Sequence, residues 1–128
     1  MSTGELGEKL AAKFLRKKGW RIVKTNLRID KDEIDILAVS PKGEILALLE
    51  VRSTKNTAKD PRATIGHEKR KCIRRAAEKL RSVAIFHHCK ARIDLLTVNL
   101  GFSPPQIVHY EAIIPFSMQI KLSKYENI

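Results

Sequence analysis

The amino-acid sequence predicts an α/β fold in which helices flank a mixed central β-sheet. Two segments, residues 4–18 and 66–82, carry apolar residues at helical spacing. The runs between and after them are rich in aliphatic and β-branched residues and are bounded by turn residues, which makes the element order α-β-β-β-α-β-β. Three directly joined strands form an antiparallel meander, whereas a strand–helix–strand connection makes a parallel pair, so the sheet is expected to be mixed.

The first helix is expected over residues 4–18, where leucine, alanine and phenylalanine recur four residues apart. Ser2 or Thr3 can accept hydrogen bonds from the first free backbone N–H groups. Gly19 follows two lysines and is expected to end the helix, because glycine readily adopts the left-handed conformation found after a helix C-terminus.

Three strands are expected next. Residues 20–24 form the first, and residues 26–31 are expected to be a polar connection. Residues 32–52 then contain two apolar runs separated by Ser40-Pro41-Lys42-Gly43, which has the composition of a turn. This stretch predicts a β-hairpin.

The register of this hairpin brings two acidic residues together. A turn centred between Lys42 and Gly43 places Asp35 directly opposite Glu50, with their Cβ atoms about 4.5–5.5 Å apart. Like charges at this distance destabilise a sheet unless a cation joins them or they share a proton. A hairpin with a merely charged outer face is the alternative, but these strands are otherwise apolar enough to be largely buried.

The second half of the chain alternates helix and strand. The second helix is expected over residues 66–82, where Ile73, Ala76 and Leu80 share one face. The other expected elements are a loop at residues 53–62, a strand at 91–98, a turn at 103–106, a strand at 107–114 and a weakly patterned tail at 117–128. The chain is expected to form a single domain over residues 1–128, with its core at about residues 4–116.

Composition limits the partners and the compartment. The 128 residues include 25 Lys and Arg against 14 Asp and Glu, which gives a net charge of +11. Such an excess favours a polyanionic partner, most often nucleic acid. Two cysteines are too few for a disulfide framework, and no apolar run reaches the length of a membrane span. We therefore expect a cytoplasmic protein with no membrane partner.

Glu8 adds a third acidic side chain to Asp35 and Glu50. It lies at the edge of the apolar stripe of the first helix, where it would be either solvated or placed over the sheet. The three carboxylates and the backbone carbonyl of Val51 would make an all-oxygen site of the kind that suits Mg²⁺ or Mn²⁺. A metal ion held there would activate water and stabilise the charge that develops in phosphodiester hydrolysis.

Basic residues cluster near the start of the second helix. Lys69 continues the face of the apolar stripe and would either point toward the sheet or pass the edge of the core. Four others fall away from the stripe and would be either solvated or in contact with nucleic-acid phosphates: Arg70, Lys71, Arg74 and Arg75.

An ordered set of these motifs resembles a known family. Glu33-Ile34-Asp35-Ile36 matches its acidic strand, and Glu50-Val51 begins its E-V-K element. Further matches are Gly7-Glu8, Ala11, Phe14-Leu15, Gly19-Trp20, Asn26, Arg28, Lys69, Ile93-Asp94-Leu95-Leu96, Ile107, His109 and Ala112. Over residues 4 to about 116 the chain resembles the YraN-like family of small bacterial endonuclease-like proteins. That family lies in the PD-(D/E)xK restriction-endonuclease-like superfamily, with the archaeal Holliday junction resolvases as relatives.

The resemblance implies a restriction-endonuclease-like core and a metal-dependent endonuclease that hydrolyses DNA, including branched or otherwise structured DNA. Asp35 and Glu50 would be catalytic and would bind Mg²⁺ or Mn²⁺, and Glu8 would support them. Glu33 would be a further acid of the site or a cross-strand partner. Relatives of this fold often cut two strands as pairs, so a homodimer is also in keeping with the resemblance.

Two positions depart from the family pattern. Asp32 replaces a glycine, and Arg52 replaces the E-x-K lysine that positions or deprotonates the attacking water. Arginine stabilises charge but does not give up its proton in a protein, so Lys69, or less directly Lys55, would have to supply the amine. Otherwise the chain would be a nuclease-like DNA-binding module without catalysis, or a basic structural or RNA-associated protein.

Overall fold

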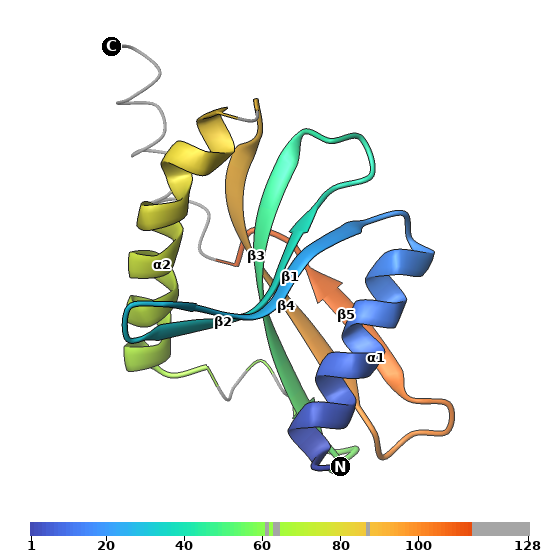
Figure 1. Cartoon of the computed structure of the whole chain (residues 1–128). Helices are drawn as coiled ribbons and strands as arrows, with labels where there is room; N and C mark the ends of the chain where they lie inside the picture. Colours follow the sequence, from blue (N-terminus) through green and yellow to red (C-terminus); the bar gives the residue numbers. More distant parts are fainter. Residues whose placement is uncertain (61, 63–64, 87, 114–128) are drawn as a thin grey trace.

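A five-stranded mixed sheet lies between two helices in the computed structural model, which describes residues 1–60, 62, 65–86 and 88–113 (Figure 1). The strands lie side by side in chain order, and all neighbours are antiparallel except β3 and β4, which are parallel. The elements are α1 (Thr3–Lys17), β1 (Arg21–Ile29), β2 (Asp32–Val39), β3 (Ile45–Thr54), α2 (His67–Phe86), β4 (Lys90–Asn99) and β5 (Gln106–Tyr110). The predicted α/β class and element order are confirmed.

Helix α1 begins and ends where its sequence predicts. The Ser2 hydroxyl accepts a hydrogen bond from the N–H of Glu5 at 3.1 Å, which satisfies one free donor of the first turn. Gly19 has a φ of 91°, and its N–H donates to the carbonyl of Arg16. The chain can therefore turn sharply from the helix into β1.

Strand β1 is longer than predicted, and the prediction of a polar connection at residues 26–31 was wrong. Pairing with β2 continues to Ile29, opposite Asp32, so only a tight turn separates the two strands. Leu27 and Ile29 pack against the core and hold this part of the strand in place. Asn26 interrupts the regular geometry with a φ of 51°.

The hairpin of β2 and β3 has the predicted register. Four pairs follow it, from Val39–Leu46 to Ile36–Leu49. The turn is closed by a 2.9 Å hydrogen bond from the N–H of Ser40 to the carbonyl of Ile45, and Gly43 supplies a positive φ of 76°.

The second helix and the last strand differ from prediction at their ends. Helix α2 extends to Phe86, beyond the expected end at residue 82, because Ala84 is fully buried and continues the packed face. Strand β5 ends at Tyr110 and not at 114, because Ala112 adopts a positive φ of 53° and leaves the ladder. The tail expected at residues 117–128 lies outside the described residues.

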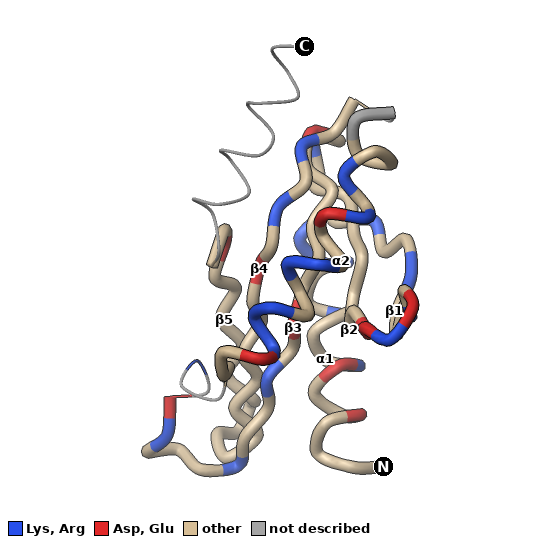
Figure 2. The backbone as a smooth tube through the Cα atoms, turned by 90° about the vertical axis from the view of Figure 1, so that its left-hand side faces the viewer, with Lys and Arg blue, Asp and Glu red and all other residues tan. Residues whose placement is uncertain are grey.

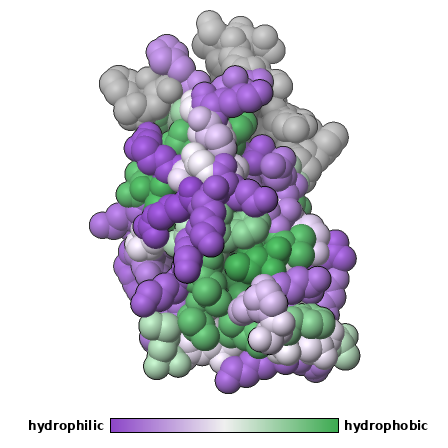
Figure 3. Space-filling view, turned by 90° about the vertical axis from the view of Figure 1, so that its right-hand side faces the viewer, coloured by the Kyte–Doolittle hydropathy of each residue, from purple (hydrophilic) through white to green (hydrophobic). Residues whose placement is uncertain are grey.

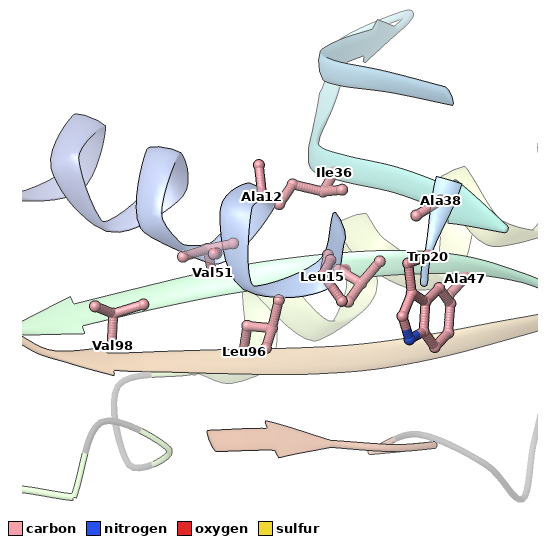
Figure 4. Close-up of a cluster of buried hydrophobic side chains, with 11 residues drawn as sticks. Ala12, Leu15, Trp20, Ile36, Ala38, Ala47, Val51, Leu96 and Val98 are labelled. Carbon is pink, nitrogen blue, oxygen red and sulfur yellow. The ribbon is translucent and has the colours of Figure 1, made fainter. Parts of the chain in front are cut away.

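Each face of the sheet has its own apolar core. The α1-side core contains Leu15, Trp20, Ile36 and Leu96 (Figure 4). The α2-side core contains side chains of α2 and the opposite face of the strands, among them Ile34 and Ile73. Partly buried side chains of α1, β5 and the β4–β5 connection border the α1-side core, and an apolar area is visible on this side of the molecule (Figure 3). None of the described helices is long and apolar enough to span a membrane.

Candidate functional site

The candidate site lies where strands β2 and β3 separate. Their ladder ends at the pair Ile36–Leu49, one residue before the position at which Asp35 would face Glu50. Here Asp35 Oδ2 accepts a 2.8 Å hydrogen bond from the N–H of Val51. A side-chain carboxylate therefore accepts a bond from β3 two residues beyond the end of the ladder.

A break in side-chain alternation accompanies this separation. Residues two apart in a regular strand lie on one face, yet Ile34 packs in the α2-side core and Ile36 in the α1-side core. Asp35 lies between them, at the point where β2 changes its facing. The register places Asp35 beside Glu50. Because the side chains of β2 switch to the other face of the sheet at this point, Asp35 is accessible from the side of α1.

Glu50 is the most constrained acid of the site. Its side chain is 4% exposed, with Oε1 lying 3.3 Å from Arg52 Nη2 and Oε2 lying 3.4 Å from Lys69 Nζ. Burial, followed by the charge of Asp35, raises the pKa of Glu50 to about 7, because Lys69 and Arg52 offset only part of these effects. A cation binding beside Glu50 would relieve the same unfavourable energy.

Glu8 approaches from helix α1. It is half-buried, and burial together with the nearby charges of Asp35 and Glu33 raises its pKa. When the Asn26 amide is oriented with its nitrogen toward the acids, it donates to Glu8 Oε2 at 3.2 Å and to Glu33 Oε1 at 3.3 Å. The positive φ of Asn26 thus accompanies a contact with two acids of the site.

Gly7 allows this approach of α1. A Cβ at position 7 would lie 1.7 Å from Ser53 Oγ and 2.9 Å from Ser53 Cβ, so only glycine lets the helix pass this close to β3. Because Glu8 is the next residue, the close packing brings its side chain to the level of Asp35.

One cleft of about 440 Å³, here called the central cleft, is lined by the predicted acids and cations Glu8, Glu33, Asp35, Glu50, Arg52 and Lys69. The structure therefore brings together the predicted catalytic and metal-binding residues. Within the described ranges, no group of three or more His, Cys, Asp or Glu side chains is arranged to hold a metal ion. Asp35 and Glu50 lie close enough to interact in this cleft, with Glu8 beside Asp35.

The four basic residues predicted to contact phosphates differ in their surroundings. Arg70, Lys71 and Arg74 are exposed on α2, which carries a row of basic residues (Figure 2). Arg75 instead forms two hydrogen bonds with Asp32, at 2.7 and 3.1 Å. Asp32 is 3% exposed, and its bonds to Arg75 lower its pKa to about 2.

The sequence reasoning missed a second polar cluster, which joins β4 to β5. Asp94 is fully buried and accepts hydrogen bonds from Arg92, from His109 Nε2 at 2.8 Å and from the N–H of Ala112 at 2.9 Å. Burial alone would raise the pKa of Asp94, but the bonds from His109, Arg92 and Ala112 lower it. A lone acid in an otherwise apolar strand, two residues after an arginine, was the available signal.

The fold and site define the class of the protein: an α/β protein whose five-stranded mixed sheet and two helices are consistent with a restriction-endonuclease-like core. Among known families, the model of the uncharacterised protein family UPF0102, which is the YraN family, matches residues 7–98. The chain belongs to this family, as predicted.

Individual relatives cover most of the chain. A UPF0102 protein of Dehalococcoides mccartyi is 35% identical over 106 residues, which are 82% of this chain and 86% of that protein. A UPF0102 protein of Carboxydothermus hydrogenoformans is 30% identical over 91% of this chain and its own full length. The solved structure of Pyrococcus furiosus SfsA in complex with Ca²⁺ covers 85% of this chain and 62% of its own, with 15% identity and a TM-score of 0.35.

Proposed function

We propose that this protein is a metal-dependent endonuclease that hydrolyses phosphodiester bonds of DNA, including branched or structured DNA. The observation that carries the proposal is the placement of Asp35 beside the nearly buried Glu50, with Lys69 and Arg52 on the two oxygens of Glu50. A net charge of +11 and the exposed cations of α2 supply the attraction for a polyanion.

The donor set fits a hard divalent cation. Mg²⁺ keeps several waters and is usually held by one or two carboxylates together with substrate phosphates, so Asp35 and Glu50 suffice as protein ligands. Glu8, beside Asp35, would contribute charge and orient one of those waters. When bound, Mg²⁺ or Mn²⁺ would supply an activated water and neutralise charge on the phosphate.

Lys69 and Arg52 would share the role of the lysine in the family's E-x-K element. Arg52 occupies that position in the chain and stabilises charge, but it is not a useful base. Lys69 comes from α2, reaches the same carboxylate and is 30% exposed, so its amine faces the central cleft. It would orient the attacking water and stabilise the developing charge on the phosphate.

The experiment that tests the proposal is a calorimetric titration of Mn²⁺ at pH 8, combined with a cleavage assay on linear and four-way-junction DNA. Asp35→Asn and Glu50→Gln should each abolish Mn²⁺ binding and cleavage while the fold is retained. Glu44→Gln is the matched control, because Glu44 is an exposed acid in the β2–β3 turn. Unchanged Mn²⁺ binding in both site variants would overturn the proposal.

A nuclease-like DNA-binding module without catalysis is the second candidate, and Arg52 in place of lysine favours it. Such a module would bind DNA in a salt-dependent way that does not respond to Mg²⁺, and it would cut none of the substrates. Cleavage that is lost in Asp35→Asn would exclude it.

A further inference from the structure

A second pocket adjoins the central cleft and shares two of its acids. It has a volume of about 310 Å³, lies between α1 and β1, and is here called the side pocket. Glu8 and Asp35 line both the side pocket and the central cleft, so the acids lie at the junction of the two. A ligand bound over these acids would therefore extend naturally into either space.

The outer wall of the side pocket carries two cations. Lys9 and Arg16 come from α1 and are seven residues apart, which places them on the same side of the helix, two turns from each other. Both are exposed, and in the described part of the chain neither forms an ion pair. Glu5 and Glu8 of the same helix also line the pocket, so this wall carries two cations and two acids.

Cations thus lie on both sides of the acidic pair. Lys69 and Arg52 are in the central cleft, on the α2 side of Glu50, whereas Lys9 and Arg16 lie beyond Asp35 on the α1 side. A nucleic-acid strand carries a negative charge at every nucleotide, so a strand that puts one phosphate at the acids has its neighbouring phosphates on either side. The arrangement cation–acid–cation matches that spacing of charge better than it matches a single compact anion.

We propose that the side pocket is a subsite for the DNA strand being cut, in which Lys9 and Arg16 bind the phosphate next to the scissile one. The inference rests on the proposed endonuclease function. It assigns the path of the strand over the protein surface, from α2 across the acids to α1. Thr25, on the β1 wall, offers a hydroxyl to the same backbone. The basic face of α2 would then bind the DNA on one side of the scissile bond, and α1 would bind it on the other side.

The chain contains a matched control for this subsite. Lys13 and Lys17 are exposed on the same helix, but neither lines the side pocket or the central cleft. The double variants Lys9→Ala/Arg16→Ala and Lys13→Ala/Lys17→Ala remove the same charge from the same element. Both pairs are solvent-exposed, so the fold should be retained in each, which circular dichroism checks.

The measurement is the salt dependence of binding to a fluorescein-labelled DNA duplex, followed by anisotropy in EDTA so that no cleavage occurs. Each lost phosphate contact reduces the magnitude of the slope of log K against log salt by about 0.9, so Lys9→Ala/Arg16→Ala, which removes the contact with one phosphate, should reduce it by about 0.9. The control pair should leave the slope unchanged, and the affinity for Mn²⁺ should be the same in both pairs. Equal slopes for the two double variants would overturn the subsite and leave the endonuclease proposal standing, whereas a wild type that fails to bind DNA would overturn both.

Discussion

Lys69 Nζ on helix α2 lies 3.4 Å from Glu50 Oε2, and Arg52 Nη2 lies 3.3 Å from the other oxygen of the same carboxylate. The lysine carries a compact ammonium with three rotatable donors, whereas the arginine carries a planar, delocalised guanidinium. The two cations are therefore not equivalent, even though they approach one carboxylate at nearly the same distance.

This difference leads to the first prediction. Lys69→Arg keeps the charge beside Glu50 but removes the compact ammonium that would orient the attacking water, so cleavage should fall by about a hundredfold, the usual effect of a misplaced reactant. Binding of Mn²⁺ and DNA should persist. Single-turnover cleavage rates provide the measurement, with Arg52→Lys as the control that should remain active. Wild-type rates in Lys69→Arg would show that only the charge at this position matters.

The second prediction concerns the stability of the metal-free protein. The pKa of Glu50 is raised from 4.5 to about 7, so between these pH values the folded state binds more protons than the unfolded state and stability falls as pH rises. At pH 8 in EDTA, Glu50→Gln should therefore be more stable than the wild type, by about 1–3 kcal/mol. The difference should disappear near pH 4, where Glu50 is protonated in both states.

Urea denaturation at the two pH values measures this effect. Addition of Mn²⁺ should stabilise the wild type and leave Glu50→Gln unchanged, because only the wild type retains both carboxylates. A Glu50→Gln variant that is less stable at pH 8 would mean that the ion pairs with Lys69 and Arg52 outweigh the cost of burial.

The third prediction concerns Asp32, whose pKa is lowered from 3.8 to about 2 by Arg75. A lowered carboxyl pKa contributes stability above pH 4 that is lost as the pH falls toward 2. Asp32→Asn should therefore lower the urea midpoint at pH 6, and the difference from wild type should narrow progressively below pH 4. Asp60→Asn is the control, since Asp60 pairs with Arg62 on the surface at 2.8 Å, close to the 2.7 Å between Asp32 and Arg75, but is half exposed. Equal losses in the two variants would show that burial of Asp32 adds nothing to its pairing.

The fourth prediction tests the close approach of α1 to β3. Helix propensity alone would make Gly7→Ala more stable by about 1 kcal/mol. The clash of the new Cβ with Ser53 should reverse the sign and cost about 1–3 kcal/mol, because the hydroxyl can rotate away but Ser53 Cβ, at 2.9 Å, cannot. Ser53→Gly should restore stability in the double variant, which a double-mutant cycle by chemical denaturation would detect. Additive effects of the two changes would argue against the contact.

The acidic pair was predictable from sequence because its geometry is local. A turn of defined length fixes the register of a hairpin, and the pairs from Val39–Leu46 to Ile36–Leu49 follow the register that places Asp35 beside Glu50. That the Lys69 side chain points toward the sheet could be predicted for a similar reason, since Lys69 shares a helix face with Ile73. Local periodicity thus defines the candidate metal pair and its nearest lysine.

Contacts between distant segments were beyond such reasoning. Arg75 and Asp32 are 43 residues apart, and their pairing depends on how α2 lies across β2. Strand β1 likewise extends through Asn26 only because β2 offers partners as far as Asp32, whereas its composition alone indicates a connection. The end of β5 is determined by Ala112, whose N–H bonds to the buried Asp94. In each case the deciding partner lies on another element.

The hydrogen bond from the N–H of Val51 to Asp35 Oδ2 has a consequence for the thermodynamics of ion capture. A free aspartate loses rotamer freedom when it coordinates a metal, and that loss weakens binding. Here the rotamer is already fixed when the strands pair, so the entropy is lost during folding, and the bond from Val51 uses only one of the two carboxylate oxygens. In the proposed metal site, Asp35 would therefore act like a ligand of a rigid chelator and not like a flexible surface acid, and capture of an ion should be driven by enthalpy and by release of its bound water.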